Sequence, residues 1–497
     1  MAIASRIGHS AKPQVRDWHT SHSTPPPCRH QDLIPVGWVM IIFRTYFLRF
    51  FVPMVLAALG LILATILLPS EWQAVNQQLI GFPDSDAAAH KARPAIMAAL
   101  CFLPSIAALL YAISGTLDRY IVRQFAGIFV ICLTGLLMIW LLVDLGDKIP
   151  EFRQSDGVFQ TIVKFYASRS PAVLSLMIPY SILLAALYSL GKLSASREII
   201  AMIQTGRGIL RITMPLIISG LLFSLLCLGL NYHWAPTAEG NVDIMLAEAA
   251  GKPADEAKNV LYPNLEARRL WLVGAFPKNY QLGKPLLDIE ITTTRADKTI
   301  VSRLSAKSAT WDRITRDWTF VEPVLGNFQP NQPAIFQTEN ETLIIPGWSE
   351  TPWQLIKPGL SAEFLGIPDL NSWLNANSKN FQFADPAPYQ TQWHYRWALP
   401  FGCLITILLA IPLGIHFSRH GAGNGVFIAV TLAGLMLLTT SISTALGASG
   451  TLPPAWAAWA PTGIFVSIAC FLLHRRVTGQ PLFLVIRRLI SKSTSSI

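Results

Sequence analysis

Charged side chains are scarce in this sequence. Only 14% of its 497 residues are charged, whereas 52% are hydrophobic, and the mean hydropathy is +0.42. A soluble domain normally carries about 25% charged residues, so the composition excludes an ordinary soluble enzyme. We therefore expect a membrane protein that carries some soluble mass.

Motifs for nucleotide hydrolysis and for hydrolytic catalysis are absent. Gly-Lys pairs begin at Gly191, Gly251 and Gly283, but none is followed by the Ser or Thr of a phosphate-binding P-loop. The patterns H-E-x-x-H and G-x-S-x-G are missing as well. The chain is therefore not expected to be an enzyme, and any ATP-driven work requires a separate subunit.

Cysteine is also scarce, with six residues in the chain. Five of them lie in apolar runs, and the long polar segment 235–395 contains none. That segment is therefore expected to fold without disulfides, even in an oxidising compartment.

A possible zinc site lies near the N-terminus, since imidazole and thiolate are good zinc ligands. Its residues are His19, His22, Cys28 and His30. A disordered polar leader that contains TPPPC is the favoured interpretation. We expect neither a metal nor another cofactor.

Eight apolar runs are long enough to cross a bilayer, which requires about 20 residues. They cover approximately residues 48–69, 94–114, 122–143, 172–191, 209–231, 397–416, 425–447 and 456–474. The first begins too late and is too long for a secretory signal. The sequence therefore predicts an α-helical polytopic membrane protein.

Basic residues gather at the ends of these runs. The net charge of +10 is therefore explained by membrane topology and does not indicate nucleic-acid binding. Cytoplasmic loops are enriched in Lys and Arg. Eight crossings with both termini in the cytoplasm place every basic cluster inside: Arg119, Arg123, Lys192, Arg197, Arg207, Arg211, Arg419, Arg475, Arg476, Arg487, Arg488 and Lys492. This orientation places segments 144–170 and 235–395 outside.

The external segment 235–395 is charged, Pro-rich and alternating in hydrophobicity. Five stretches predict strands separated by turn residues: 268–276, 286–294, 298–311, 317–328 and 335–348. About a hundred residues of short strands favour a sandwich or jelly roll. A helical link then leads back to the membrane. The predicted fold is thus a polytopic helical protein with an inserted external all-β, jellyroll-like domain.

Residues 190–208, LGKLSASREIIAMIQTGRG, form a charged segment between two predicted spans. Ser194 or Ser196 can cap a helix start, Ile199 and Met202 fall on one face, and Gly206 can end the helix. The physics alone leaves two alternatives open: a helix lying in the headgroups and a helix that docks into a protein groove.

Several stretches resemble the LptF/LptG lipopolysaccharide-export permeases. They are LDRYIVRQF, IPYSILLAALYSLGKLSASREIIAMIQTGRG, NYHWAPTAEG and GTLPPAWAAWAPT. The resemblance covers about residues 117–476 in the family's order. Whether the chain is LptF-like or LptG-like stays open, although LDRYI favours the latter.

The resemblance implies a transmembrane permease subunit of an ABC-type exporter that extracts lipopolysaccharide from the outer leaflet of the bacterial inner membrane. Its implied partners are an LptB-like cytoplasmic ATPase dimer, a second LptF/LptG-type permease, and LptC-like and LptA-like periplasmic bridge proteins. Residues 194–206 are then the coupling helix that contacts the ATPase, with these residues in that role: Arg197, Glu198, Ile199, Met202 and Gly206. Lys148 is the implied lipid contact.

The implied organisation divides the chain into six parts. These are a leader (1–47), two additional spans (48–116), permease spans one to three (117–234), a periplasmic β domain with its helical link (235–395), permease spans four to six (396–476) and a cytoplasmic tail (477–497). The two additional spans depart from the family, and Lys148 is the single match to its lysine cluster.

An alternative function is a membrane-anchored envelope biogenesis factor or enzyme that acts through the periplasmic domain. Such a protein needs a polar constellation, and the candidates are His233, Glu239 and Asp243. A solvated collar of side chains is the favoured interpretation of these three residues.

The topology is testable with a single cysteine. We expect Asn327→Cys, in the segment predicted to be external, to react with a membrane-impermeant thiol reagent in cells permeabilised only at the outer membrane. Labelling that requires lysis of the inner membrane would contradict the predicted orientation.

Overall fold

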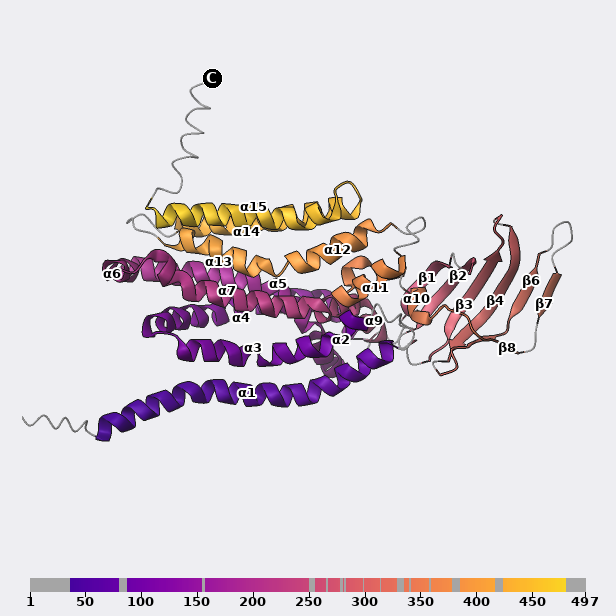
Figure 1. Ribbon diagram of the computed structural model, residues 1–497, viewed down its shortest axis with the longest axis horizontal. Coiled ribbons are helices and arrows are strands. Elements are labelled where there is room, and N and C mark those ends of the chain that lie inside the picture. The colour runs from indigo at the N-terminus through magenta and orange to yellow at the C-terminus, as the bar shows by residue number, and fades with distance from the viewer. Residues whose placement is uncertain are drawn as a thin grey trace, which may run out of the picture. The chain divides into compact units, whose positions relative to one another are not determined.

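The computed structural model describes residues 36–79, 87–153, 157–249, 255–264, 267–277, 280, 283–297, 299–312, 314–328, 335–338, 341–356, 359–377, 385–415 and 423–479 (Figure 1). The zinc-ligand candidates His19, His22, Cys28 and His30 lie outside these residues, as do Arg419 and the basic tail beyond 479. Of residues 1–49, the structure describes the beginning of the first helix, from Val36 onward.

Helices make up the chain on both sides of the strands. The helices before the strands are α1 (Val36–Leu79), α2 (Ala87–Lys91), α3 (Arg93–Ile113), α4 (Thr116–Phe152), α5 (Val158–Ala195), α6 (Glu198–Gln204), α7 (Ile209–Tyr232), α8 (Trp234–Gly240) and α9 (Val242–Ala249). Those after the strands are α10 (Pro352–Ile356), the 3₁₀ helix η4 (Ala362–Phe364), α11 (Ile367–Asn377), α12 (Ala387–Ala398), α13 (Phe401–Gly414), α14 (Gly423–Ala448) and α15 (Pro454–Val477).

Seven described helices are long and apolar enough to cross a membrane, and a bent pair raises the number to as many as eight. The pair is α12 and α13, which meet at 49°. Its break coincides with Pro400, which precedes α13 and lacks the backbone N–H that a continuous helix needs. The predicted sixth span, 397–416, is therefore interrupted by a bend near its beginning.

The centre of the helical part is formed by α5 and α13, which pack against each other. Leu187 and Leu190 of α5 and Ile407 and Ile411 of α13 are buried in one apolar cluster. Gly414 allows α13 to approach α5 closely, because a Cβ at this position would lie 2.9 Å from the Cβ of Leu190. The helices α4, α7, α14 and α15 pack around this pair. By contrast, Ile131 and Leu142 of α4 are exposed.

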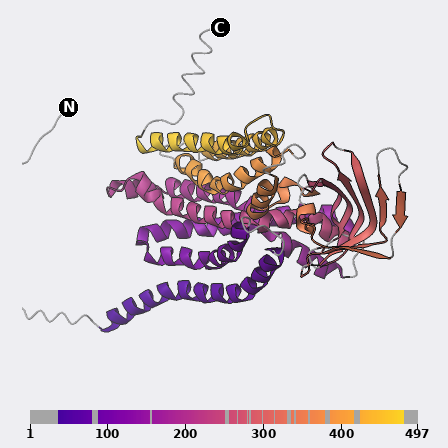
Figure 2. The same cartoon turned by 45° about the vertical axis from the view of Figure 1, so that its right-hand side comes forward.

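The strands β1 (Asp255–Asn264), β2 (Arg269–Pro277), β3 (Leu286–Thr294), β4 (Ile300–Trp311), β5 (Trp318–Val321), β6 (Val324–Asn327), β7 (Ile335–Thr338) and β8 (Thr342–Ile345) form one antiparallel sheet. The sheet is curved, as Figure 2 shows. We call residues 255–356 the β domain. Strands lie in all five predicted stretches, whereas β1 was not predicted.

From β1 to β5 the sheet is a meander in which each strand pairs with the next. One half of β4 pairs with β5, and the other half pairs with β6. On their far sides, β5 pairs with β8 and β6 pairs with β7. Residues Glu322 and Pro323 separate β5 from β6, and Glu322 has a φ of 54°. A jelly roll needs Greek-key crossings between two sheets. The described strands show none, so the jellyroll-like prediction is not confirmed beyond its all-β character.

One face of the sheet carries the core of the β domain. The side chains of Trp271, Trp318 and Phe320 are fully buried there, together with Leu355 and Ile356 of α10. The rings of Trp271 and Trp318 lie 5.0 Å apart between centroids. Aromatic burial of this extent supplies the stability of a domain whose described residues contain no cysteine.

Candidate functional site

Two polar clusters lie at opposite ends of the long helices α4 and α5. The chain leaves α5 through α6 to α7 at one end, which we call the α6 end. It leaves α7 through α8 and α9 to the strands at the other, which we call the β end. The two candidate sites from the sequence, residues 194–206 and Lys148, therefore lie at opposite ends of the bundle.

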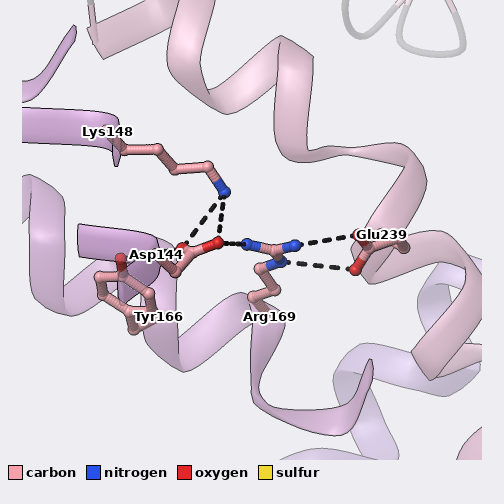
Figure 3. Close-up of polar contacts among 5 residues, drawn as sticks. All are labelled: Asp144, Lys148, Tyr166, Arg169 and Glu239. Atoms are coloured by element: carbon pink, nitrogen blue, oxygen red, sulfur yellow. Dashed lines mark hydrogen bonds and ion pairs between the residues drawn. The ribbon is translucent and has the colours of Figure 1, made fainter. Parts of the chain in front are cut away.

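At the β end, Arg169 of α5 joins three helices (Figure 3). Its guanidinium lies 2.7 Å from a carboxylate oxygen of Asp144 on α4 and 3.0 Å from one of Glu239 on α8. Lys148, one turn beyond Asp144, donates to the same carboxylate at 3.1 Å. The Tyr166 hydroxyl donates to Asp144 at 2.9 Å.

This β-end cluster consists of two cations and two carboxylates, so its formal charges cancel. Most of its side chains are largely withdrawn from solvent, with 16% of Lys148, 15% of Asp144 and 13% of Arg169 exposed. The Lys148 ammonium also lies 4.9 Å from the ring centroid of Phe165. Lys148 is therefore an ion-paired residue, and an anionic ligand has to compete with Asp144 for it.

At the α6 end, the short helix α6 is held by Glu198. One oxygen of the Glu198 carboxylate accepts from the Tyr120 hydroxyl of α4 at 2.7 Å, and the other accepts from Ser196 at 2.9 Å. Nearby, the guanidinium of Arg211 on α7 makes two hydrogen bonds of 2.9 Å to Asp118 of α4. The beginnings of α4, α6 and α7 are thus tied together by polar contacts.

The predicted helix 194–206 is wrong in its limits. Helix α5 continues to Ala195, and Ser194 is buried within it, so neither serine caps a new helix. Arg197 reverses the chain with a left-handed φ of 59°, and α6 begins at Glu198. The prediction that a glycine follows the end of this helix is correct. Gly206 has a φ of 84°, which a glycine adopts without strain.

The predicted face of α6 is also corrected. Ile199 is only 1% exposed and belongs to the chain's own apolar core, and Met202 packs against that core. The side chain of Ile199 is therefore not available to fill a groove of a partner, whereas Met202 is partly exposed. The exposed face of α6 instead presents Ala201 and Gln204, flanked by Arg197.

The alternative polar constellation is not assembled. His233 lies 3.4 Å from Asp369 of α11, whereas Glu239 pairs with Arg169. The described residues hold no group of three or more His, Cys, Asp or Glu side chains that could bind a metal. Two members of the predicted trio, His233 and Glu239, therefore have separate structural partners, and the third, Asp243, is exposed on α9.

A cavity of about 260 Å³ lies between α5, α12, α13, α14 and α15. Its walls are mostly apolar and include Leu176, Leu399 and Met436. Arg396 lines it near the bend of α12 and α13, and its guanidinium donates to the backbone carbonyl of Glu363. Sequence reasoning missed this cavity, because its walls come from helices on both sides of the β domain in the sequence.

Comparison with known proteins now identifies the chain. Residues 119–475 match the family described as lipopolysaccharide export system permease LptF/LptG. The chain belongs to the LptF/LptG family. No curated protein matches it. Family membership supports a permease of lipopolysaccharide export, and the apolar helices make it a multi-pass membrane protein. Helices α1, α2 and α3 lie outside the LptF/LptG match.

The ion pairs of the β-end cluster are expected to stabilise the folded protein. Arg169→Ala leaves two partly buried carboxylates without their shared partner, which should cost about 2 kcal/mol or more. Arg169→Lys keeps the charge but not the fork that reaches both carboxylates. We expect the thermal midpoint of the purified protein to fall most in Arg169→Ala and less in Arg169→Lys. The exposed Lys164→Ala should behave as wild type, and equal midpoints for all four proteins would contradict the bridge.

Proposed function

We propose that this chain is the permease subunit of an ABC-type lipopolysaccharide exporter in a bacterial inner membrane. A separate cytoplasmic ATPase drives it, and a second LptF/LptG-type permease completes the membrane channel. Periplasmic bridge proteins of the LptC and LptA kind receive the lipid. The observation that carries this proposal is α6, a short helix with a solvent-exposed face between two spans of a chain from the LptF/LptG family.

The contacts of α6 support a coupling role. Its buried face, with Ile199, joins it to the core of the bundle, and its Glu198 is hydrogen-bonded to Tyr120 of α4. Movement of α6 therefore acts on α4 directly. Because α4 has 37 residues, it spans roughly 55 Å, and its far end carries Asp144 and Lys148.

The exposed face of α6 is the ATPase-binding surface in this proposal. Arg197, Ala201 and Gln204 present a small and polar surface, on which Ala201 allows close approach of a partner. Glu198 and Met202 act from the inner side, where they fix the helix to α4 and to the core. This division of roles replaces the expected one, in which Ile199 enters the partner.

The lipid contact is proposed at the β end, at Lys148, on the expectation from the family that lipid passes between α4 and α14. Both helices pack on α5, and both expose apolar side chains, including Val130 of α4 and Phe427 of α14. A lipid phosphate that approaches Lys148 exchanges places with Asp144, and Arg169 keeps Asp144 paired during the exchange. The cluster can thus bind an anion without leaving a carboxylate unpaired.

Docking of the ATPase can be tested on the exposed face. We expect Ala201→Arg to abolish co-purification of the ATPase, because a long charged side chain would occupy the contact surface. The fold should be unaffected, since Ala201 is exposed. The control is Val477→Arg at the exposed end of α15. Full retention of the ATPase by Ala201→Arg would remove the main support for a transporter subunit.

Lipid contact can be tested by charge reversal. We expect Lys148→Glu to reduce crosslinking to lipopolysaccharide at least tenfold, equivalent to about 1.4 kcal/mol, while ATPase binding is retained. Lys164→Glu is the matched control, because Lys164 is exposed in the following helix α5. If both variants crosslink lipid as wild type does, Lys148 serves only the ion pair with Asp144.

A further inference from the structure

The helices α1, α2 and α3 precede the LptF/LptG match, and the structure shows how they are attached. Helix α3 packs against α7 so closely that a Cβ at Gly229 would lie 2.4 Å from Leu100. On its other side, a Cβ at Gly60 of α1 would lie 2.6 Å from the carbonyl oxygen of Cys101. These contacts make α1 and α3 a packed extension of the permease.

A buried polar network lies where α2 and α3 meet the rest of the chain. Arg93 of α3 is 3% exposed and pairs with Glu71 of α1 at 2.5 Å. The fully buried His90 of α2 lies 3.1 Å from the hydroxyl of Ser372 on α11, measured from its Nε2. The hydroxyl of Tyr232, at the end of α7, donates to the carbonyl of Ala89 at 2.9 Å.

The same network surrounds Asp369, another buried residue of α11. Burial by itself would raise the pKa of this carboxyl, but contact with His233 and the proximity of His90 and Arg93 lower it to about 2. The carboxylate is therefore charged, and a buried charge is tolerated only where partners surround it. Two of these partners, His90 and Arg93, come from the segment that precedes the LptF/LptG match.

Helix α11 lies on the path by which the chain returns from the β domain to α12. Trp373 of α11 stacks on Tyr389 of α12 with ring centroids 3.4 Å apart. The residue before α11, Gly366, lies against α7, since a Cβ there would be 2.7 Å from the carbonyl oxygen of Tyr232. Thus α12, the end of α7 and α2 all pack against α11.

We propose that α1, α2 and α3 form an anchoring module that fixes the root of the β domain, helix α11, to the permease through the His90–Ser372 contact and the hydrogen bond from Tyr232 to Ala89. The module acts by position: α2 packs against α11 and supplies His90 as a buried partner for Ser372. This inference does not depend on the identity of the transported lipid or of the ATPase.

The test is hydrogen exchange of the full-length protein in lipid nanodiscs. In His90→Ala, Ser372 loses a buried partner, and we expect the amides of α11 to exchange roughly tenfold faster than in wild type. Ser372→Ala removes the same contact from the other side with a smaller change in volume and should have the same effect. The strands β3 and β4, distant in the fold, should exchange at the wild-type rate in both variants.

Two further variants separate anchoring from general damage. His90→Gln keeps a side chain that can hydrogen-bond to Ser372 and should restore most of the protection of α11. Ile106→Ala removes an exposed apolar side chain of the same module and should leave α11 unchanged. Wild-type exchange of α11 in both His90→Ala and Ser372→Ala would overturn the proposal. So would a uniform rise across all helices and strands.

Discussion

The bridge from Arg169 to Asp144 and Glu239 is the interaction on which the β end of this permease depends. It joins α4, α5 and α8 through one guanidinium, where most of the side chains concerned have little contact with water. Arg169 is the residue that both carboxylates share, so its removal would break the ionic link of α8 to α4 and α5 at this point. The same bridge places Lys148 beside Asp144 and so defines the candidate lipid contact.

The two ends of α4 make this helix the mechanical link in the proposed function. At the α6 end it contacts Glu198 through Tyr120 and Arg211 through Asp118. At the β end it carries Asp144 and Lys148. A force on α6 can thus reach the candidate lipid contact through one continuous helix, while α5 and α13 provide the buried core against which α4 moves.

The sequence predicted the parts of the fold that depend on local hydrophobicity. Apolar runs located the spans, and alternation located β3 at its observed limits. The prediction missed β1, an edge strand that is polar and contains Pro263. The limits of α6 were wrong because Arg197 adopts a left-handed conformation, which is uncommon for a residue other than glycine and which local sequence patterns do not indicate. The pairing of Asp144 with Lys148 follows from their spacing of four residues, but its extension to Glu239 depends on the tertiary fold.

The central claim is that this chain moves lipopolysaccharide when a bound ATPase hydrolyses ATP. The most direct measurement is to purify the full-length protein with its native partners, reconstitute the complex with lipopolysaccharide in proteoliposomes, and follow lipid transfer to a soluble acceptor protein. The account predicts an ATPase and a second permease in the complex, and transfer that requires ATP. A complex without an ATPase, or transfer at the same rate without ATP, would contradict it.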